Sequence, residues 1–245
     1  MDVYEALYTT RAMRRLRPDP IPLDVQARIL DAAIRAPSGN NTQDDIRFLL
    51  VDDADLKARL APLYRDTQDR MMGIFADRVA AAEAEPDEPG SAALLAMVRS
   101  IRHLGAHFEE VPLLLFGFMR SATVEGFEGQ AGDRRGAAWR SVPRAFADDN
   151  DAAEIFPAIW SAMLAARAEG IGTTLTTALG AFHVEEVFEI LGVPTGEGWT
   201  MYCCVTLGYP TGRWGLAARQ PVGNVTHRNR WGTSAGLPVV TPSWT

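Results

Sequence analysis

Residues 154–179 constrain the fold most, because they join an almost wholly apolar segment to a threonine-rich one. Residues 155–168 leave few polar positions on any face, and a helix that is apolar nearly all round is buried in a core. At about 15 residues, such a helix is too short to span a bilayer. Gly170 and Gly172 follow the helix and predict its end. We therefore expect the core to form around this helix.

The threonine-rich segment, Thr-Thr-Leu-Thr-Thr at residues 173–177, favours a short strand. Its hydroxyls need partners, because polar groups at the exit of a buried helix are costly when they are unpaired. Two interpretations are open. The segment is either a core strand whose hydroxyls bond to backbone, or a wall that meets a planar polar cofactor. These residues alone favour the core strand.

The composition is that of a globular protein, with 47% hydrophobic residues among 245. A formal net charge of −7, from 24 Lys and Arg against 31 Asp and Glu, disfavours general nucleic-acid binding. The start has no apolar stretch of the kind found in a signal peptide, so we expect a cytoplasmic protein without membrane contact. Cys203 and Cys204 are adjacent and the four histidines are scattered, so the sequence predicts neither a disulfide framework nor a metal site.

The other elements follow from apolar spacing and from chain breakers. The predicted helices are 3–9, 23–36, a helical region from 52 to about 82 interrupted at Pro62, 92–110 and 183–192. The predicted strands are 47–51, 111–119 and 199–207. We expect a single domain over residues 1–245, in which the charged residues 120–150 form a lid and residues 208–245 form an extended tail.

Two polar segments are weak signals by themselves. Arg11, Arg14 and Arg15 precede a proline-rich stretch that forbids a continuing helix, and they fit either a solvated basic patch or an anion site. Residues 38–43, Ser-Gly-Asn-Asn-Thr-Gln, fit either an ordinary turn or a loop that gives amides to a ligand. The sequence contains no GxGxxG after a strand, no GxxxxGK[ST] and no HExxH motif, and no nucleophile stands out beside a base.

Five segments, taken in order between residues 4 and 232, resemble the nitroreductase family of FMN-dependent oxidoreductases. They are TTRAMRRLRPDPIP, APSGNNTQ, AHFEEVPLLLF, IFPAIWSAMLAARAEGIGTTLTT and LGYPTGRWGLAARQPVGNVTHRNRWG. The resemblance implies an α+β fold with a central mixed, mainly antiparallel sheet flanked by helices. It also implies a segment-exchanged homodimer, with FMN in the interface and the 208–245 tail wrapped around the partner subunit.

The resemblance assigns the FMN contacts residue by residue. Arg11 and Arg219 would hold the phosphate, and Arg14 would reach the pyrimidine edge near N1 and O2. The remaining positions are Ala12 and Met13, with backbone groups; Pro37, Ser38 and Gly39, packing on the flavin from the other subunit; Asn41 and Gln43, matching polar motif positions; and Leu175, Thr176 and Thr177, facing the ring, with a backbone amide at N5.

The chain departs from the family pattern at three places. Thr10 stands where a first arginine is common, and Ala12 stands where a serine is common. Asp44, Asp45 and Ile46 replace the usual Pro-Trp or x-Trp after the glutamine. The last departure affects the expected substrate preference.

The resemblance implies that NADH or NADPH reduces the flavin at N5, and that a nitroaromatic, quinone or related acceptor then reoxidises it by a ping-pong mechanism. The flavin would carry the chemistry, so no catalytic side chain is expected. A single flavin explains the threonines, the small polar loop and the arginines together, which reverses the preference for a plain core strand. The alternatives are a specialised flavin dehydrogenase or oxidase, a flavin-fragmenting synthase, and a non-enzymatic FMN-binding protein.

Overall fold

The computed structural model describes residues 1–38, 45–120 and 144–241, with backbone only for residues 144–150. The chain divides into two compact units. The terminal unit joins Met1–Arg11 to Arg213–Thr245, and the sheet unit is Ala12–Gly212. This division does not test the predicted single nitroreductase-like domain, which stays a prediction.

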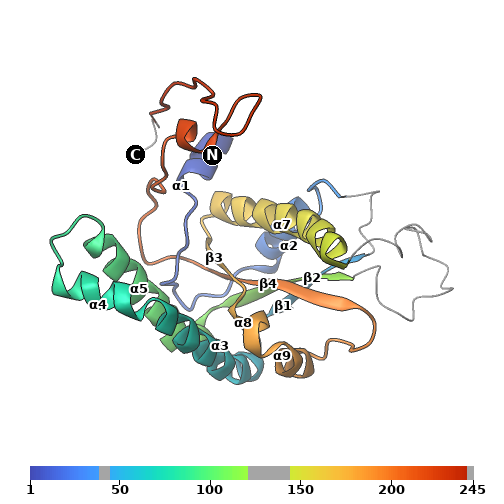
Figure 1. The fold of residues 1–245 in the computed structure, drawn as a ribbon. Coiled ribbons are helices and arrows are strands. Elements are labelled where there is room, and N and C mark those ends of the chain that lie inside the picture. Colours follow the sequence, from blue (N-terminus) through green and yellow to red (C-terminus); the bar gives the residue numbers. More distant parts are fainter. Residues whose placement is uncertain (39–44, 121–143, 242–245) are drawn as a thin grey trace. The chain divides into compact units, whose positions relative to one another are not determined.

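The sheet unit contains the strands and most of the helices in the described part of the chain (Figure 1). Its elements are α2 (Leu23–Ala33), β1 (Ile46–Val51), α3 (Ala54–Ile74), α4 (Ala76–Ala84), α5 (Ser91–Ala106), the 3-10 helix η3 (Phe108–Glu110), β2 (Leu113–Arg120), α7 (Arg144–Ala168), β3 (Gly172–Thr176), α8 (Ala178–Phe182), α9 (Val184–Leu191) and β4 (Trp199–Gly208).

The four strands form one sheet in the order β1-β2-β4-β3, and every pair of neighbours is antiparallel. The register of β2 against β4 shifts between Gly117 and Phe118. Ala12 adds a parallel bridge to Thr173 at the β3 edge. Helices with a mainly antiparallel sheet confirm the predicted α+β class.

The adjacent cysteines show how the sheet separates two cores. Successive strand residues point to opposite faces, so Cys203 belongs to the core that α2 and α7 cover, whereas Cys204 belongs to the core that α3, α8 and α9 cover (Figure 1). Both thiols are free and buried. Burial raises the pKa of Cys203 to about 12 and that of Cys204 well above its ordinary value.

The apolar segment forms a buried helix, as predicted, within α7. Ile155 and Ile159 are fully buried against the sheet at Gly117, where a Cβ atom would lie 3.3 Å from Ile155 Cγ1 and 3.1 Å from Ile159 Cδ1. The absence of a side chain at Gly117 therefore lets α7 approach closely. Beyond α7, Gly170 adopts a φ of 76°, which favours glycine.

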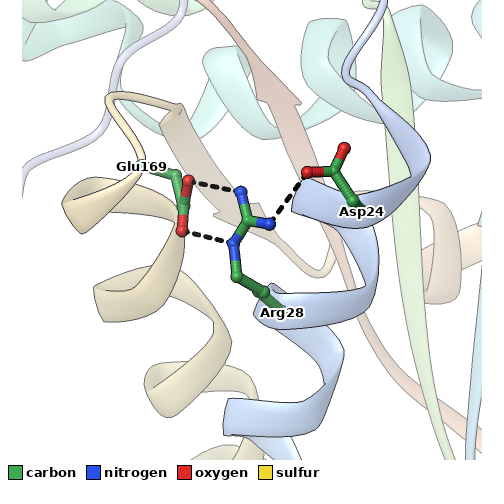
Figure 2. Close-up of polar contacts among 3 residues, drawn as sticks. All are labelled: Asp24, Arg28 and Glu169. Carbon is green, nitrogen blue, oxygen red and sulfur yellow. Dashed lines mark hydrogen bonds and ion pairs between the residues drawn. The ribbon is translucent and has the colours of Figure 1, made fainter.

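An ion-pair cluster links α2 to the residue that follows α7 (Figure 2). Arg28 donates two bonds to Glu169, Nε to Oε1 at 2.8 Å and Nη2 to Oε2 at 3.0 Å. Its Nη1 donates to Asp24 Oδ2 at 2.9 Å. These hydrogen bonds lower the pKa of both carboxyls. The cluster is exposed, so it orients the two helices more than it stabilises them.

One helix prediction was wrong and another differs in detail. The predicted interruption at Pro62 does not occur, because α3 runs through the proline to Ile74 and the break falls at Phe75. A helical proline removes the bond to the carbonyl four residues earlier, and here that carbonyl belongs to the exposed Ala58, where water can bond to it. The predicted helix 92–110 is helical except at His107, where α5 ends and η3 follows.

Other boundaries differ by a few residues. The predicted helix 23–36 ends at Ala33, and α7 begins at Arg144, ahead of the apolar segment. The predicted lid, residues 120–150, begins at the last residue of β2 and ends inside α7. Its residues 121–143 lie outside the described part, so the lid stays a prediction. In the described part, no helix combines the length and apolar character needed to cross a membrane.

The terminal unit combines α1 (Val3–Thr9) with the C-terminal segment. Asp2 caps α1, because its Oδ1 accepts a hydrogen bond from the Tyr4 amide at 2.9 Å. The Ala217 amide donates to the Tyr8 carbonyl at 2.9 Å and so ties the C-terminal segment to α1. Apart from the 3-10 helix η4 (Val222–Val225), residues 213–241 are irregular. The wrapping of this tail around a partner stays a prediction.

Candidate functional site

The predicted site begins where the arm at Ala12–Arg14 lies along the edge of β3. The Met13 amide donates to the Thr173 carbonyl at 2.9 Å, and the Thr174 hydroxyl donates to the Met13 carbonyl at 3.1 Å. Gly172 allows this approach, because a Cβ atom there would lie 2.8 Å from Met13 Cβ. The Met13 amide is therefore already hydrogen-bonded within the protein. The Met13 carbonyl can accept a second hydrogen bond, so it is the Met13 backbone group that remains available to a ligand.

The first half of the threonine-rich segment fits a core strand, and the second half fits a wall that a ligand can contact. Thr173 and Thr174 are buried, and the Thr174 hydroxyl bonds to backbone as a core strand requires. Leu175 and Thr177 are exposed instead, and Thr176 is half-buried. The Thr176 Oγ1 accepts a hydrogen bond from the Ala178 amide at 3.2 Å. Residues 175–177 are thus the part of the segment that a ligand can reach.

Arg14 is half-buried, and within the described part of the chain its guanidinium makes no hydrogen bond and no ion pair. Burial lowers its pKa, because desolvation disfavours the charged form, and electrostatic interaction with Tyr64 opposes this shift. Arginine keeps its charge in proteins even so. The arm therefore presents an uncompensated, partly desolvated cation, which suits a ligand that carries oxygen acceptors.

Tyr64 is the residue that the sequence prediction missed. It lies on α3 and is 3% exposed. Burial raises the pKa of its phenol, and the Thr176 hydroxyl and the Arg14 charge oppose that rise. A tyrosine inside an amphipathic helix carries no local signal of such a role. These two residues lie 50 positions before Tyr64 and 112 positions after it in the sequence.

The two predicted phosphate ligands belong to the terminal unit. Arg11 Nη2 donates to the Arg213 carbonyl at 2.8 Å, and Arg219 Nη1 donates to the Ala218 carbonyl at 2.8 Å. Both side chains are exposed. Neither is paired with a carboxylate within the described ranges, so both retain donors for an anion.

The predicted loop after α2 is only partly described. Pro37 and Ser38 line a small cavity of about 70 Å³, together with Ile46, Phe48 and Ala158. Gly39, Asn41 and Gln43 lie outside the described residues, so their predicted roles stay predictions.

Asp45, one of the residues that depart from the family pattern, pairs with the end of β2. Its Oδ1 accepts two bonds from Arg120, from Nε at 3.2 Å and from Nη2 at 3.0 Å. The Arg120 guanidinium also lies 5.3 Å from the centre of the Trp199 ring, a cation–π geometry. The Asp45 carboxylate therefore links the start of β1 to the end of β2. In the described part of the chain, no three His, Cys, Asp or Glu side chains are grouped as a metal site would require.

Comparisons with known proteins agree on the family to which the chain is similar. The nitroreductase family model matches residues 7–209. A protein named NADH dehydrogenase from Thermus thermophilus is 28% identical over 217 residues, which cover 86% of this chain and 87% of that protein.

Two solved structures share the fold. A BluB-like flavoprotein from Clostridium difficile 630 has a TM-score of 0.63 and 17% identity, over 94% of this chain and 100% of that one. The NADPH:FMN oxidoreductase from Vibrio harveyi, complexed with NAD+, has a TM-score of 0.61 and 17% identity, over 94% of this chain and 77% of that one. Because the family model covers most of the sequence and these structures share the α+β fold, the chain belongs to the nitroreductase family of oxidoreductases.

Proposed function

We propose that this protein is an FMN-dependent oxidoreductase that uses NADH or NADPH to reduce a nitroaromatic, a quinone or a related acceptor. Family membership supports the reaction class. The observation that supports a flavin is the half-buried Arg14 guanidinium, which makes no hydrogen bond or ion pair among the described residues. An uncompensated buried charge is costly, and the polar pyrimidine edge of FMN would offset that cost.

The chain's own residues divide the work of holding FMN. Arg14 would donate to the pyrimidine edge and stabilise negative charge that develops there. Leu175, Thr176 and Thr177 would lie against the ring. Arg11 and Arg219 would bind the phosphate, for which arginine forks are well suited. When bound, FMN would accept a hydride from NADH or NADPH and pass it to the acceptor.

The proposal is tested by mixing the purified, FMN-loaded protein with NADH or NADPH under anaerobic conditions and following flavin absorbance by stopped flow. Rapid bleaching by either nucleotide, followed by reoxidation with a nitroaromatic or quinone, is the expected result. Failure of the protein to bind FMN would reject the proposal. Binding without bleaching by either nucleotide would favour a non-enzymatic flavin protein, and bleaching by another donor alone would favour a specialised dehydrogenase.

Arg14→Met tests the role proposed for Arg14 at the pyrimidine edge of FMN. Arg14→Met keeps much of the side-chain volume but removes the charge, and charge-assisted hydrogen bonds are worth about 1.5–3 kcal/mol. We therefore expect FMN and riboflavin each to bind roughly 10- to 100-fold more weakly. Arg17→Met is the matched control, because Arg17 is exposed and pairs with Asp19 at 3.4 Å. Equal affinities for the two variants would contradict the assignment.

We also propose that the working protein is a homodimer. The terminal unit exposes large apolar side chains, and Trp231 is 92% exposed. The others include Leu216, Val222, Val225, Leu237, Val239 and Val240. Exposed apolar surface of this kind marks interaction sites. Light scattering should give twice the chain mass of 26.8 kDa, and a folded, FMN-loaded monomer would contradict the dimer.

A further inference from the structure

Lys57 is the only lysine in the sequence, so the rest of the 24 Lys and Arg residues are arginines. It lies near the start of α3 and is 7% exposed. Its Nζ donates to the Val111 carbonyl at 2.8 Å. Arginine keeps its charge in proteins, whereas a lysine amine can lose its proton and act as a nucleophile. Position 57 therefore carries a chemical capacity that none of the arginines has.

Lys57 lines a cleft of about 550 Å³ where β1 ends and β2 begins. The apolar walls of the cleft are Leu16, Pro18, Pro20 and Pro112. A Cβ atom at Gly208 would lie 3.0 Å from both Leu16 Cβ and Pro112 Cδ, so this glycine lets the two walls approach β4. None of the residues that line the cleft is among those proposed to hold FMN. The cleft is therefore a candidate for a second binding site.

Three carboxylates line the same cleft, those of Asp52, Glu109 and Glu110. In the part of the chain that the structure describes, none of them forms an ion pair with Lys57. Glu110 Oε1 lies 2.9 Å from His107 Nδ1. Glu109 Oε2 is buried, lies 3.6 Å from Arg65 Nη2 and accepts no hydrogen bond from the described residues. The lining is thus more negative than positive, and Glu109 has an oxygen that can accept a proton.

The surroundings of Lys57 favour its neutral amine. Burial lowers the pKa of Lys57 because desolvation disfavours the ammonium form, and the charges of Asp52 and Asp53 oppose this shift. A neutral amine that donates one N–H to the Val111 carbonyl keeps its lone pair. Lysines that are desolvated in this way form imines with carbonyl compounds. The negative lining disfavours an anionic carbonyl compound, and the apolar walls favour one that carries an apolar group.

We propose that the Lys57 amine condenses in this cleft with an uncharged aldehyde that carries an apolar group, and that Glu109 transfers the protons. Nζ attacks the carbonyl carbon, and the π electron pair of the C=O bond moves to the oxygen. Glu109 takes the two amine protons in turn and delivers them to that oxygen, which leaves as water when the C=N bond forms. One amine and one aldehyde thus give one imine and one water.

Benzaldehyde is the probe, and cyanoborohydride reduces any imine to a stable secondary amine. The purified full-length protein is treated at pH 7 with any flavin that it carries in place. Labelling of Lys57 competes only with labelling of the α-amino group, because the sequence has no other lysine. Trypsin does not cut after an alkylated lysine, so mass spectrometry should find the peptide 48–57 replaced by the peptide 48–59.

The same protein unfolded in guanidinium chloride is the reference, because Lys57 is then an ordinary lysine in the same chain. We expect the ratio of Lys57 labelling to α-amino labelling to be about tenfold higher, or more, in the folded protein. Each unit lost from the pKa of an amine raises its neutral fraction about tenfold. An equal or lower ratio in the folded protein would overturn the proposal, because burial would then only hide the amine.

4-Carboxybenzaldehyde tests the preference for an uncharged compound. It undergoes the same reaction but carries a negative charge toward Asp52, Glu109 and Glu110. In the folded protein we expect its labelling ratio at Lys57 to be lower than that of benzaldehyde by about fivefold or more, the factor that corresponds to about 1 kcal/mol of repulsion. In the unfolded protein the two aldehydes should give similar ratios. Equal ratios in the folded protein would contradict this preference.

Glu109→Gln tests the proton transfer, because it keeps the size of the side chain and removes the carboxylate. General acid–base groups typically contribute 100-fold or more, and Asp52 and Glu110 remain in the cleft. We therefore expect labelling of Lys57 to slow by about tenfold or more, with labelling of the α-amino group unchanged. Glu83→Gln is the matched control, since Glu83 is exposed on α4 and does not line the cleft. Equal labelling of the two variants would show that the role given to Glu109 is wrong.

Discussion

Gly172→Ala should separate the Ala12–Arg14 arm from β3. Gly172 is the first residue of β3, and the arm passes directly over it. A Cβ atom there would lie 2.8 Å from Met13 Cβ and 3.1 Å from Pro210 Cβ. Both neighbours are Cβ atoms fixed to the backbone, so a change of rotamer cannot relieve the clash. The arm itself has to move.

The size of the effect follows from these distances. Carbon atoms in contact prefer about 3.5–4.0 Å, so the gap to Met13 has to widen by roughly 0.7–1.2 Å. Overpacking of this kind costs about 1–3 kcal/mol. If the arm detaches instead, the bond from the Met13 amide and the bond from the Thr174 hydroxyl are lost, at about 0.5–1.5 kcal/mol each. Either response destabilises the protein by about 1–3 kcal/mol.

The same displacement should weaken flavin binding, because Arg14 directly follows Met13. We expect Gly172→Ala to reduce the affinity for FMN and for riboflavin alike, since the phosphate arginines lie in the terminal unit. Urea unfolding gives the free energy of unfolding, and fluorescence titration gives the flavin affinities.

Gly212→Ala is the control for this substitution. No heavy atom lies within 4 Å of a Cβ at Gly212, and its backbone does not require positive φ. Its free energy of unfolding should therefore stay within about 0.5 kcal/mol of the wild type. If Gly172→Ala behaves like Gly212→Ala in both assays, the reasoning about the arm is refuted.

Three further predictions address other parts of the chain. Arg219→Ala should weaken FMN by roughly 10- to 100-fold and leave riboflavin unchanged, because riboflavin has no phosphate; an equal loss for both flavins would indicate misfolding instead. Hydrogen bonding to Asp66 raises the pKa of His183 above its ordinary value of 6.5 and lowers that of Asp66 below 3.8. The stabilising contribution of His183 is therefore complete below about pH 6.5 and lost as the pH rises through the folded pKa, whereas that of Asp66 is lost as the pH falls through its own folded pKa. His183→Gln should flatten the pH dependence of the free energy of unfolding between about pH 6 and 8. An unchanged pH dependence would contradict the stabilising role of the His183–Asp66 interaction. Because Cys203 and Cys204 are buried and their pKa values are raised, a thiol reagent should label them only as the protein unfolds, and rapid labelling of the native protein would be inconsistent with this packing.

The sequence predicts the central helix and sheet well, because their signals are local. An all-round apolar segment has few places to lie except between a sheet and another helix, and the structure shows α7 in that position. Gly170, with its positive φ, marks the helix end that the sequence indicates. Pro62 misled the prediction, since the rule against helical proline weakens where the missing hydrogen bond faces solvent.

The candidate site is harder to predict, because its contacts are long-range. The sequence groups Arg11 with Arg14, whereas the structure assigns them to different units. Gly105 reads from the sequence as one more residue of a helix, although it leaves space for Gln68 from α3. No periodicity contains that information, because it depends on how α3 and α5 pack together.

The α3 helix supports the proposed wall at two points. Tyr64 belongs to the same buried core as Ala178 and Leu179, the first two residues of α8. One residue after α8, His183 Nε2 lies 2.7 Å from Asp66 Oδ2. The α8 segment is thus held by the buried residues at its start and, at its end, by Asp66 of α3. An isolated loop would lose its geometry easily, since exposed polar residues contribute little packing. Held in this way, the segment keeps its position through the core below it, so substitutions on α3 should change flavin binding without touching the flavin.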